Sequence, residues 1–170
     1  FVSNLTNGAG AAIFGSGSTT VRRSSIRGIR DAVGMPSAIH VPQGGTLLVE
    51  NSLIDGTPLA VGATETGGIS ADRPAQLVVR NSTLVAFTDI GINVIADGAT
   101  DLRVYNSILR KCELATLAGP PPMLAYDYNL TFTEQCNIAG EGNFVAGVLI
   151  GPVTAIPGSF VHMRVPPFPS

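Results

Sequence analysis

An internal repeat constrains the fold of this chain more than any other feature of its sequence. Residues 38–54 align without gaps with residues 68–84, and both contain the pattern V-x-[NR]-S-x-[IL]. A further copy lies at 91–109, a shorter one at 13–26 and a degenerate one at 126–132. A repeat of this length indicates a solenoid, in which each unit packs on its neighbours. We therefore predict about five stacked units from these five copies.

Apolar and polar residues alternate within each copy, which is the pattern of a half-buried β-strand. Leu47 and Val49 fall on one face and Glu50 on the other, and Arg80 and Tyr105 take the place of Glu50 in the next two copies. A second short strand precedes this one, across a turn rich in Gly, Pro or Asp. Such a unit cannot close its own core, but units stacked about 4.8 Å apart pair strand on strand. The sequence thus predicts an all-β parallel solenoid with aliphatic ladders inside.

An Asn-Ser step follows the strand in three copies, at Asn51, Asn81 and Asn106. Asparagine tolerates left-handed backbone angles and its amide can bond a neighbouring amide, so we predict a turn in which stacked asparagines form a ladder. Asn129 of the degenerate copy adds one rung, and in that alignment Asp127 stands where the other copies bury valine. Arg23 replaces the asparagine in the first copy, and we expect it near an end cap.

The pattern G-I-x-V, a turn and then L-x-V-x-N-S-x-I resembles the repeat of the pectate-lyase-like superfamily, over roughly residues 12–132. In style it looks closest to bacterial secreted and surface repeat proteins. The resemblance implies a right-handed parallel β-helix, since parallel crossovers are almost always right-handed. A length of 170 residues suits one domain over residues 1–170, and the resemblance implies an irregular C-terminal segment at 133–170. The abrupt run at 166–170 favours a fragment of a longer protein as the alternative.

Charge and hydropathy narrow the class of partner. Twelve acidic and ten basic residues give a formal charge of -2, so no large field of one sign is expected and nucleic acid is not a predicted partner. The longest apolar stretches are broken by glycine. A membrane span, which needs about eighteen or more apolar residues in a row, is therefore not predicted.

The resemblance raises an enzymatic alternative, because many such proteins cleave acidic polysaccharides with clustered acids and a nearby base. Asp55 and Asp89 follow the Asn-Ser strand of successive copies, and Arg110 with Lys111 follows it one copy later. These four residues are the candidate catalytic groove, and calcium is expected only if that alternative holds. No Asp-x-Asp or comparable ligand spacing is present, so no metal or other cofactor is assigned.

Two cysteines fall at nearly the same position of successive units, Cys112 and Cys136. A spacing near 4.8 Å between coils lies within the Cα separations that disulfides allow. A disulfide and a pair of buried thiols both stay open. A disulfide would indicate an oxidising compartment.

We expect a secreted or cell-surface structural and binding module that presents a repetitive face to a glycan or to another protein. The first alternative is a polysaccharide-active enzyme, either a lyase or a glycoside hydrolase. The second is a fibre-forming subunit, because an uncapped solenoid exposes unpaired strands at which copies can associate end to end.

Overall fold

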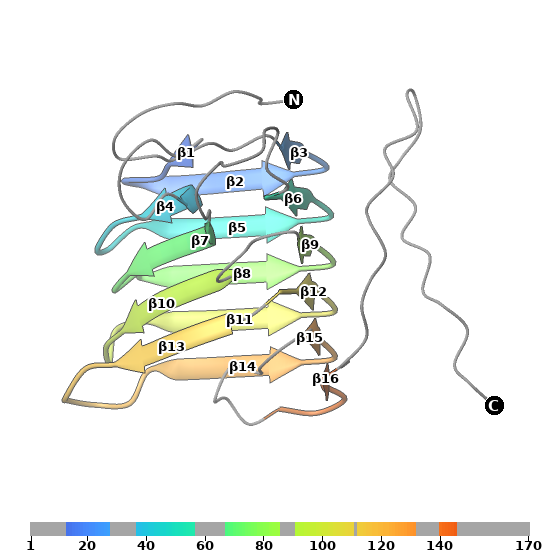
Figure 1. Cartoon of the computed structure of the whole chain (residues 1–170). Helices are drawn as coiled ribbons and strands as arrows, with labels where there is room; N and C mark the ends of the chain where they lie inside the picture. Colours follow the sequence, from blue (N-terminus) through green and yellow to red (C-terminus); the bar gives the residue numbers. More distant parts are fainter. Residues whose placement is uncertain are drawn as a thin grey trace, which may run out of the picture.

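The computed structural model describes residues 13–27, 37–56, 67–85, 91–110, 112–131 and 140–145, and these residues form one stack of coils (Figure 1). Strands are the regular secondary structure of the described residues, and every strand pairing among them is parallel. No helix that could cross a membrane occurs in this part of the chain.

The strands form three parallel sheets that run along the stack. Sheet 1 contains β1 (Ile13–Phe14), β4 (Ser37–Val41), β7 (Gly67–Asp72), β10 (Ile92–Ala96) and β13 (Cys112–Thr116). Sheet 2 contains β2 (Ser18–Arg22), β5 (Thr46–Glu50), β8 (Gln76–Arg80), β11 (Asp101–Tyr105) and β14 (Met123–Asp127). Sheet 3 contains β3 (Ser25–Arg27), β6 (Leu53–Asp55), β9 (Thr83–Val85), β12 (Ile108–Leu109), β15 (Leu130–Thr131) and β16 (Phe144–Val145).

Each coil contributes one strand to each sheet, so the chain is a parallel β-helix with five complete coils in its described part. Strand β16 begins a sixth turn below β15 (Figure 1). The predicted fold class is confirmed. Of the segment predicted to be irregular, 133–170, the structure describes residues 140–145, which supply that sixth turn.

The core consists of ladders of like side chains in register from coil to coil. One such ladder on sheet 2 is Val21, Val49, Val79, Val104 and Tyr126. All of its members are buried, and isoleucine and leucine form parallel ladders beside it. Burying each of these side chains contributes about 1.5–3 kcal/mol. Because a shift by one residue would reverse the two faces of every strand, these ladders fix the register of the stack.

The fifth coil corrects one detail of the predicted alignment. Asp127 was predicted at the position of the buried valine, but Tyr126 pairs with Val104 and is fully buried, while Asp127 pairs with Tyr105 on the outer face. The reason is the cost of burying a carboxylate, which exceeds that of burying a phenol. The Tyr126 hydroxyl makes no hydrogen bond of standard geometry. Burial raises the pKa of Tyr126 to about 12, and the neighbouring Thr131 side chain only partly opposes that shift.

Candidate binding groove

Each coil passes from sheet 2 to sheet 3 through one residue with a left-handed backbone, which defines a column along the corner of the stack. We name this the left-handed column. Its members and φ angles are Arg23 (48°), Asn51 (50°), Asn81 (50°), Asn106 (47°), Tyr128 (56°) and Gly142 (63°). The predicted turn at the three Asn-Ser steps is therefore confirmed. Arg23 lies in the first described coil, and its expected place near an end cap stays a prediction.

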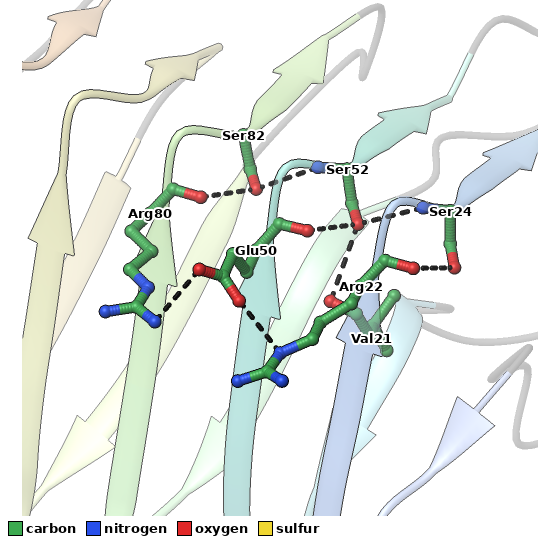
Figure 2. Close-up of polar contacts among 7 residues, drawn as sticks. All are labelled: Val21, Arg22, Ser24, Glu50, Ser52, Arg80 and Ser82. Atoms are coloured by element: carbon green, nitrogen blue, oxygen red, sulfur yellow. Dashed lines mark hydrogen bonds and ion pairs between the residues drawn. The ribbon is translucent and has the colours of Figure 1, made fainter.

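The residue after each member of that column points inward, and these residues carry the hydrogen-bonded ladder. The backbone N–H of Ser24 donates to the Ser52 hydroxyl (3.2 Å), the N–H of Ser52 donates to the Ser82 hydroxyl (3.2 Å), and the pattern continues from Ser82 to Ser107 (3.3 Å). Each hydroxyl also donates to the carbonyl two residues earlier in its own coil, as Figure 2 shows for Ser24, Ser52 and Ser82. We name these residues the serine column.

Asparagines extend the serine column at its C-terminal end. The Asn129 side-chain oxygen accepts the Ser107 N–H (3.0 Å), and its amide donates to the Val104 carbonyl (2.9 Å). Asn143 repeats the arrangement one turn on, accepting the Asn129 N–H at 2.9 Å. The prediction that Asn129 continues the asparagine ladder is therefore wrong, since Asn129 lies in the serine column and Tyr128 takes the left-handed position.

The predicted ladder of asparagine amides is also wrong. The side chains of Asn51, Asn81 and Asn106 are exposed, whereas Ser52, Ser82 and Ser107 are buried. No hydrogen bond joins the amides of the three asparagines in the described part of the chain. A convex corner turns the left-handed side chain outward, and the next residue is the one that faces its counterparts inside. The asparagine side chains are therefore exposed at the surface and do not join the coils.

An ion-pair network runs along the outer face of sheet 2 just before the corner. Glu50 accepts from the Arg22 guanidinium at 2.8 Å and from the Arg80 guanidinium at 2.9 Å, so it lies between arginines of the coils before and after its own (Figure 2). The Glu50 side chain is only 18% exposed. Each pair contributes about 0.2–1 kcal/mol at such a surface. The network holds three outward side chains in fixed positions.

Beside this network the corner is hollowed into an open groove of about 580 Å³. It spans the second to the fifth coil, and we name it the corner groove. Its lining residues are Glu50, Arg80, Asn81, Tyr105, Asn106, Asp127 and Tyr128. The groove thus combines two aromatic rings, two amides, an arginine and two carboxylates along the solenoid axis.

The sixth turn fixes the C-terminal end of the corner groove. The Glu141 N–H donates to a side-chain oxygen of Asp127 (2.8 Å), and the Tyr128 N–H donates to the Glu141 carbonyl (2.8 Å). The Tyr128 ring lies so close to Gly142 that a Cβ at position 142 would come within 2.4 Å of it. Glycine at 142 therefore leaves room for the ring of Tyr128, which is 61% exposed, beside the last turn.

A second polar cluster lies on the same face of sheet 2, at the N-terminal ends of β8 and β11. The Asp101 carboxylate accepts from Arg103 at 2.8 Å and from the Gln76 amide at 2.9 Å. The hydrogen bond from Arg103 is the main reason that the pKa of Asp101 is lowered, and the bond from Gln76 adds to it against the effect of burial. The same bond raises the pKa of Arg103. Both side chains are charged at neutral pH, so the negative charge of Asp101 balances the positive charge of Arg103 on this face.

The structure does not bring together the described members of the predicted catalytic groove. Asp55 is buried in β6 and lies in register with Val85 of the next coil. Arg110 follows β12, one coil beyond Val85, so an apolar side chain separates the two. Asp89 and Lys111 lie outside the described residues. Within the described ranges no three His, Cys, Asp or Glu side chains gather as metal ligands do.

Cys112 lies in the core of sheet 1, in register with Ile92, and is disulfide-bonded. Its predicted partner, Cys136, lies outside the described residues, so that pairing stays a prediction. The alternative of a buried free thiol at Cys112 is wrong.

Three groove residues, Glu50, Arg80 and Tyr105, carry a signal in the sequence, because the alternation places them outward. Asp127 and Tyr128 were missed, since the asparagine-matched alignment put them one position away. Comparison with family models, with curated proteins and with solved structures finds no match for this chain. We therefore infer a function from the geometry of the corner groove.

Proposed function

We propose that this β-solenoid is a secreted or cell-surface binding module that holds a glycan chain in the corner groove. The observation that carries the proposal is the placement of two tyrosines beside amide and ionic side chains in one open groove. Aromatic side chains offer an apolar face with a polar end, and sugar rings present apolar C–H faces edged by hydroxyls. The asparagines and charged groups supply donors and acceptors for those hydroxyls.

The periodicity of the groove supports an extended ligand. Glu50, Arg80, Tyr105 and Asp127 follow one another in register, one per coil. Such a row repeats about every 4.8 Å along the axis, so a linear polymer lying parallel to the stack meets a new polar or aromatic side chain at each step. We also propose kinship with the right-handed β-helices of the pectate-lyase-like superfamily, on the strength of the repeat motif.

We favour binding over cleavage because of the spacing of the groove carboxylates. Glu50 and Asp127 lie three coil steps apart, which is about 14 Å at 4.8 Å per step. Paired carboxyl groups in glycoside hydrolases lie about 5–9.5 Å apart. Glu50 is in addition held between two arginines. This arrangement supports a positioned, charge-compensated binding surface.

A location outside the cytoplasm is the second part of the proposal. Disulfides persist in oxidising compartments and are rare in the reducing cytosol. The disulfide at Cys112 supports a secreted or surface-exposed protein.

The test is calorimetric titration with hexasaccharides: β-1,4-glucose, β-1,4-N-acetylglucosamine, β-1,4-glucosamine and α-1,4-galacturonate. We expect at least one to bind, and Tyr128→Asn to weaken it by about tenfold, which corresponds to about 1.4 kcal/mol. Asparagine suits the left-handed backbone at 128, so this variant is expected to fold.

The matched control is Phe14→Ala, because Phe14 is equally exposed, at 62%, but lies on sheet 1. It should leave binding unchanged. If none of the four hexasaccharides binds, or if both variants weaken binding equally, the proposed function is wrong.

A further inference from the structure

Asp127 differs from the other acidic residues on the outer face of sheet 2. Glu50 is bound by two arginines and Asp101 by one. Among the described residues the Asp127 carboxylate forms no ion pair, and the one hydrogen bond that it accepts comes from the backbone N–H of Glu141. The corner groove therefore ends in a carboxylate that is oriented by the backbone but not neutralised by a side chain.

The arginines of this face are already engaged. Arg22 and Arg80 both bind Glu50, and Arg103 binds Asp101. Arg80 lies two coil steps from Asp127, which is about 10 Å, the length over which salt screens surface charges. The arginines are thus held away from the C-terminal end of the groove, where the local charge is negative.

The unpaired carboxylate has aromatic neighbours on two sides. Tyr105 precedes it in register in the adjacent coil, and Tyr128 follows it in the chain. The face of an aromatic ring attracts cations, by about 0.5–1 kcal/mol at exposed sites. A carboxylate between two tyrosines is a favourable place for an ammonium group and an unfavourable one for an anion.

We propose that the corner groove selects a glycan that carries free amino groups, with an ammonium group held by Asp127 between Tyr105 and Tyr128. The inference rests on the proposed function and names the class of glycan. A ligand that contacts both Asp127 and Tyr128 needs its charge close to a flat apolar face, because these two residues are neighbours in the chain. An amino sugar has its ammonium group fixed directly on the ring and meets this requirement. A lysine side chain carries its charge at the end of a flexible stem.

The experiment compares β-1,4-glucosamine hexasaccharide with its fully N-acetylated form, which has the same backbone and no charge. The whole chain should bind the free amine about tenfold more tightly, as expected for one exposed ion pair with aromatic support. The preference should shrink as salt is raised from about 0.05 to about 0.5 M. It should also disappear when the pH is raised past the pKa of the sugar amine.

Asp127→Asn should abolish this preference, because the amide keeps an oxygen for the Glu141 N–H but loses the charge. Glu113→Gln removes one charge from sheet 1 and should leave the preference at its full value. The thermal unfolding midpoint of each variant shows whether it is folded.

The outcomes separate this inference from the proposed function. Equal binding of the two hexasaccharides, or tighter binding of galacturonate, overturns amine selection and leaves glycan binding standing. Binding of pentalysine with no preference for the amino sugar overturns amine selection in favour of a basic protein segment. A preference that survives Asp127→Asn overturns the assignment to Asp127. No binding of any hexasaccharide overturns both proposals.

Discussion

Two columns of side chains run side by side along one corner of this β-helix, and they differ in almost every respect. The serine column is buried from Ser52 to Asn129 and is bonded from coil to coil, because each backbone N–H donates to a side-chain oxygen of the next turn. The left-handed column is one residue away in the chain, and its asparagine side chains are exposed. The first column specifies how coils stack. The second forms the bend, and its members Asn81, Asn106 and Tyr128 line the corner groove.

The difference shows how a repeat can conserve a fold and vary a surface at adjacent positions. A left-handed residue at a convex corner points outward, like the last strand residue before it. Two outward side chains therefore follow one another, and the next inward side chain comes one residue later than strict alternation would place it. In the second coil Glu50 and Asn51 both point outward before Ser52 returns to the interior. Fold and recognition are thereby assigned to neighbouring residues.

Loss of Asn129 is the change with the largest expected effect on this corner. Asn129→Ala removes the acceptor of the Ser107 N–H and the donor to the Val104 carbonyl, both buried. Since each unsatisfied buried group costs about 1–3 kcal/mol, we expect a loss of about 2–4 kcal/mol in the free energy of unfolding, measured in urea. Asn129→Ser restores the residue type of the other coils and should recover part of that loss. Equal stability of Asn129→Ala and the parent would contradict the serine column.

Substitution of an asparagine in the left-handed column should change stability only through the backbone. Asn106→Ala is expected to cost about 1–2 kcal/mol, because alanine is strained at a φ of 47°. Asn106→Gly adopts that angle without strain and should stay within about 0.5 kcal/mol of the parent. Urea unfolding of both variants checks this. A large loss in the glycine variant would mean that the asparagine side chain itself supports the stack.

Asp101 is intermediate between the two columns, because it lies on the outer face yet is only 8% exposed. Its pKa in the folded protein is lowered, chiefly by Arg103, so its contribution to stability is present above the unfolded-state pKa of about 3.9. That contribution is lost as the pH falls through the folded-state pKa. Asp101→Asn should therefore be less stable than the parent at pH 6, by up to about 1 kcal/mol, with the gap closing toward pH 2. A stability difference between Asp101→Asn and the parent that does not change with pH would rule out the lowered pKa of Asp101 as its cause.

The smallest effect is expected from the ion pairs of Glu50. Glu50→Gln removes the charge that joins Arg22 and Arg80, and should cost less than about 1 kcal/mol at low salt. The difference should narrow in about 0.5 M salt, since surface ion pairs are screened. Thermal unfolding at the two salt concentrations tests this. A salt-independent loss would indicate packing rather than charge.

Much of the fold could be predicted, because apolar ladders leave a period-two pattern in every copy. Leu47 and Val49 were assigned to one face of their strand from the sequence, and each is buried in register with its counterpart, Leu77 or Val79. The number of coils follows from the number of copies. Repetition makes such a prediction strong, since each copy tests the alignment of the others.

The candidate site was harder to predict, because two registers fit the fifth copy. Matching Asn129 to the other asparagines is natural in the sequence, but it places Asp127 in the core. The structure instead buries Tyr126 and moves Asp127 and Tyr128 to the groove. Within the Asn-Ser step, the buried residue is the one whose side chain the convex corner turns inward. Because both residues are polar, the sequence does not reveal which of them that is.

The free energies of unfolding of Ser82→Ala and Asn81→Gly, substitutions at two neighbours in one coil, distinguish most directly which column joins the coils. We expect Ser82→Ala to lose about 1–3 kcal/mol, because the Ser52 N–H is left without its acceptor, and Asn81→Gly to change by less than about 0.5 kcal/mol. A larger loss in Asn81→Gly than in Ser82→Ala would contradict this expectation, and the asparagines would then be the residues that hold the coils together.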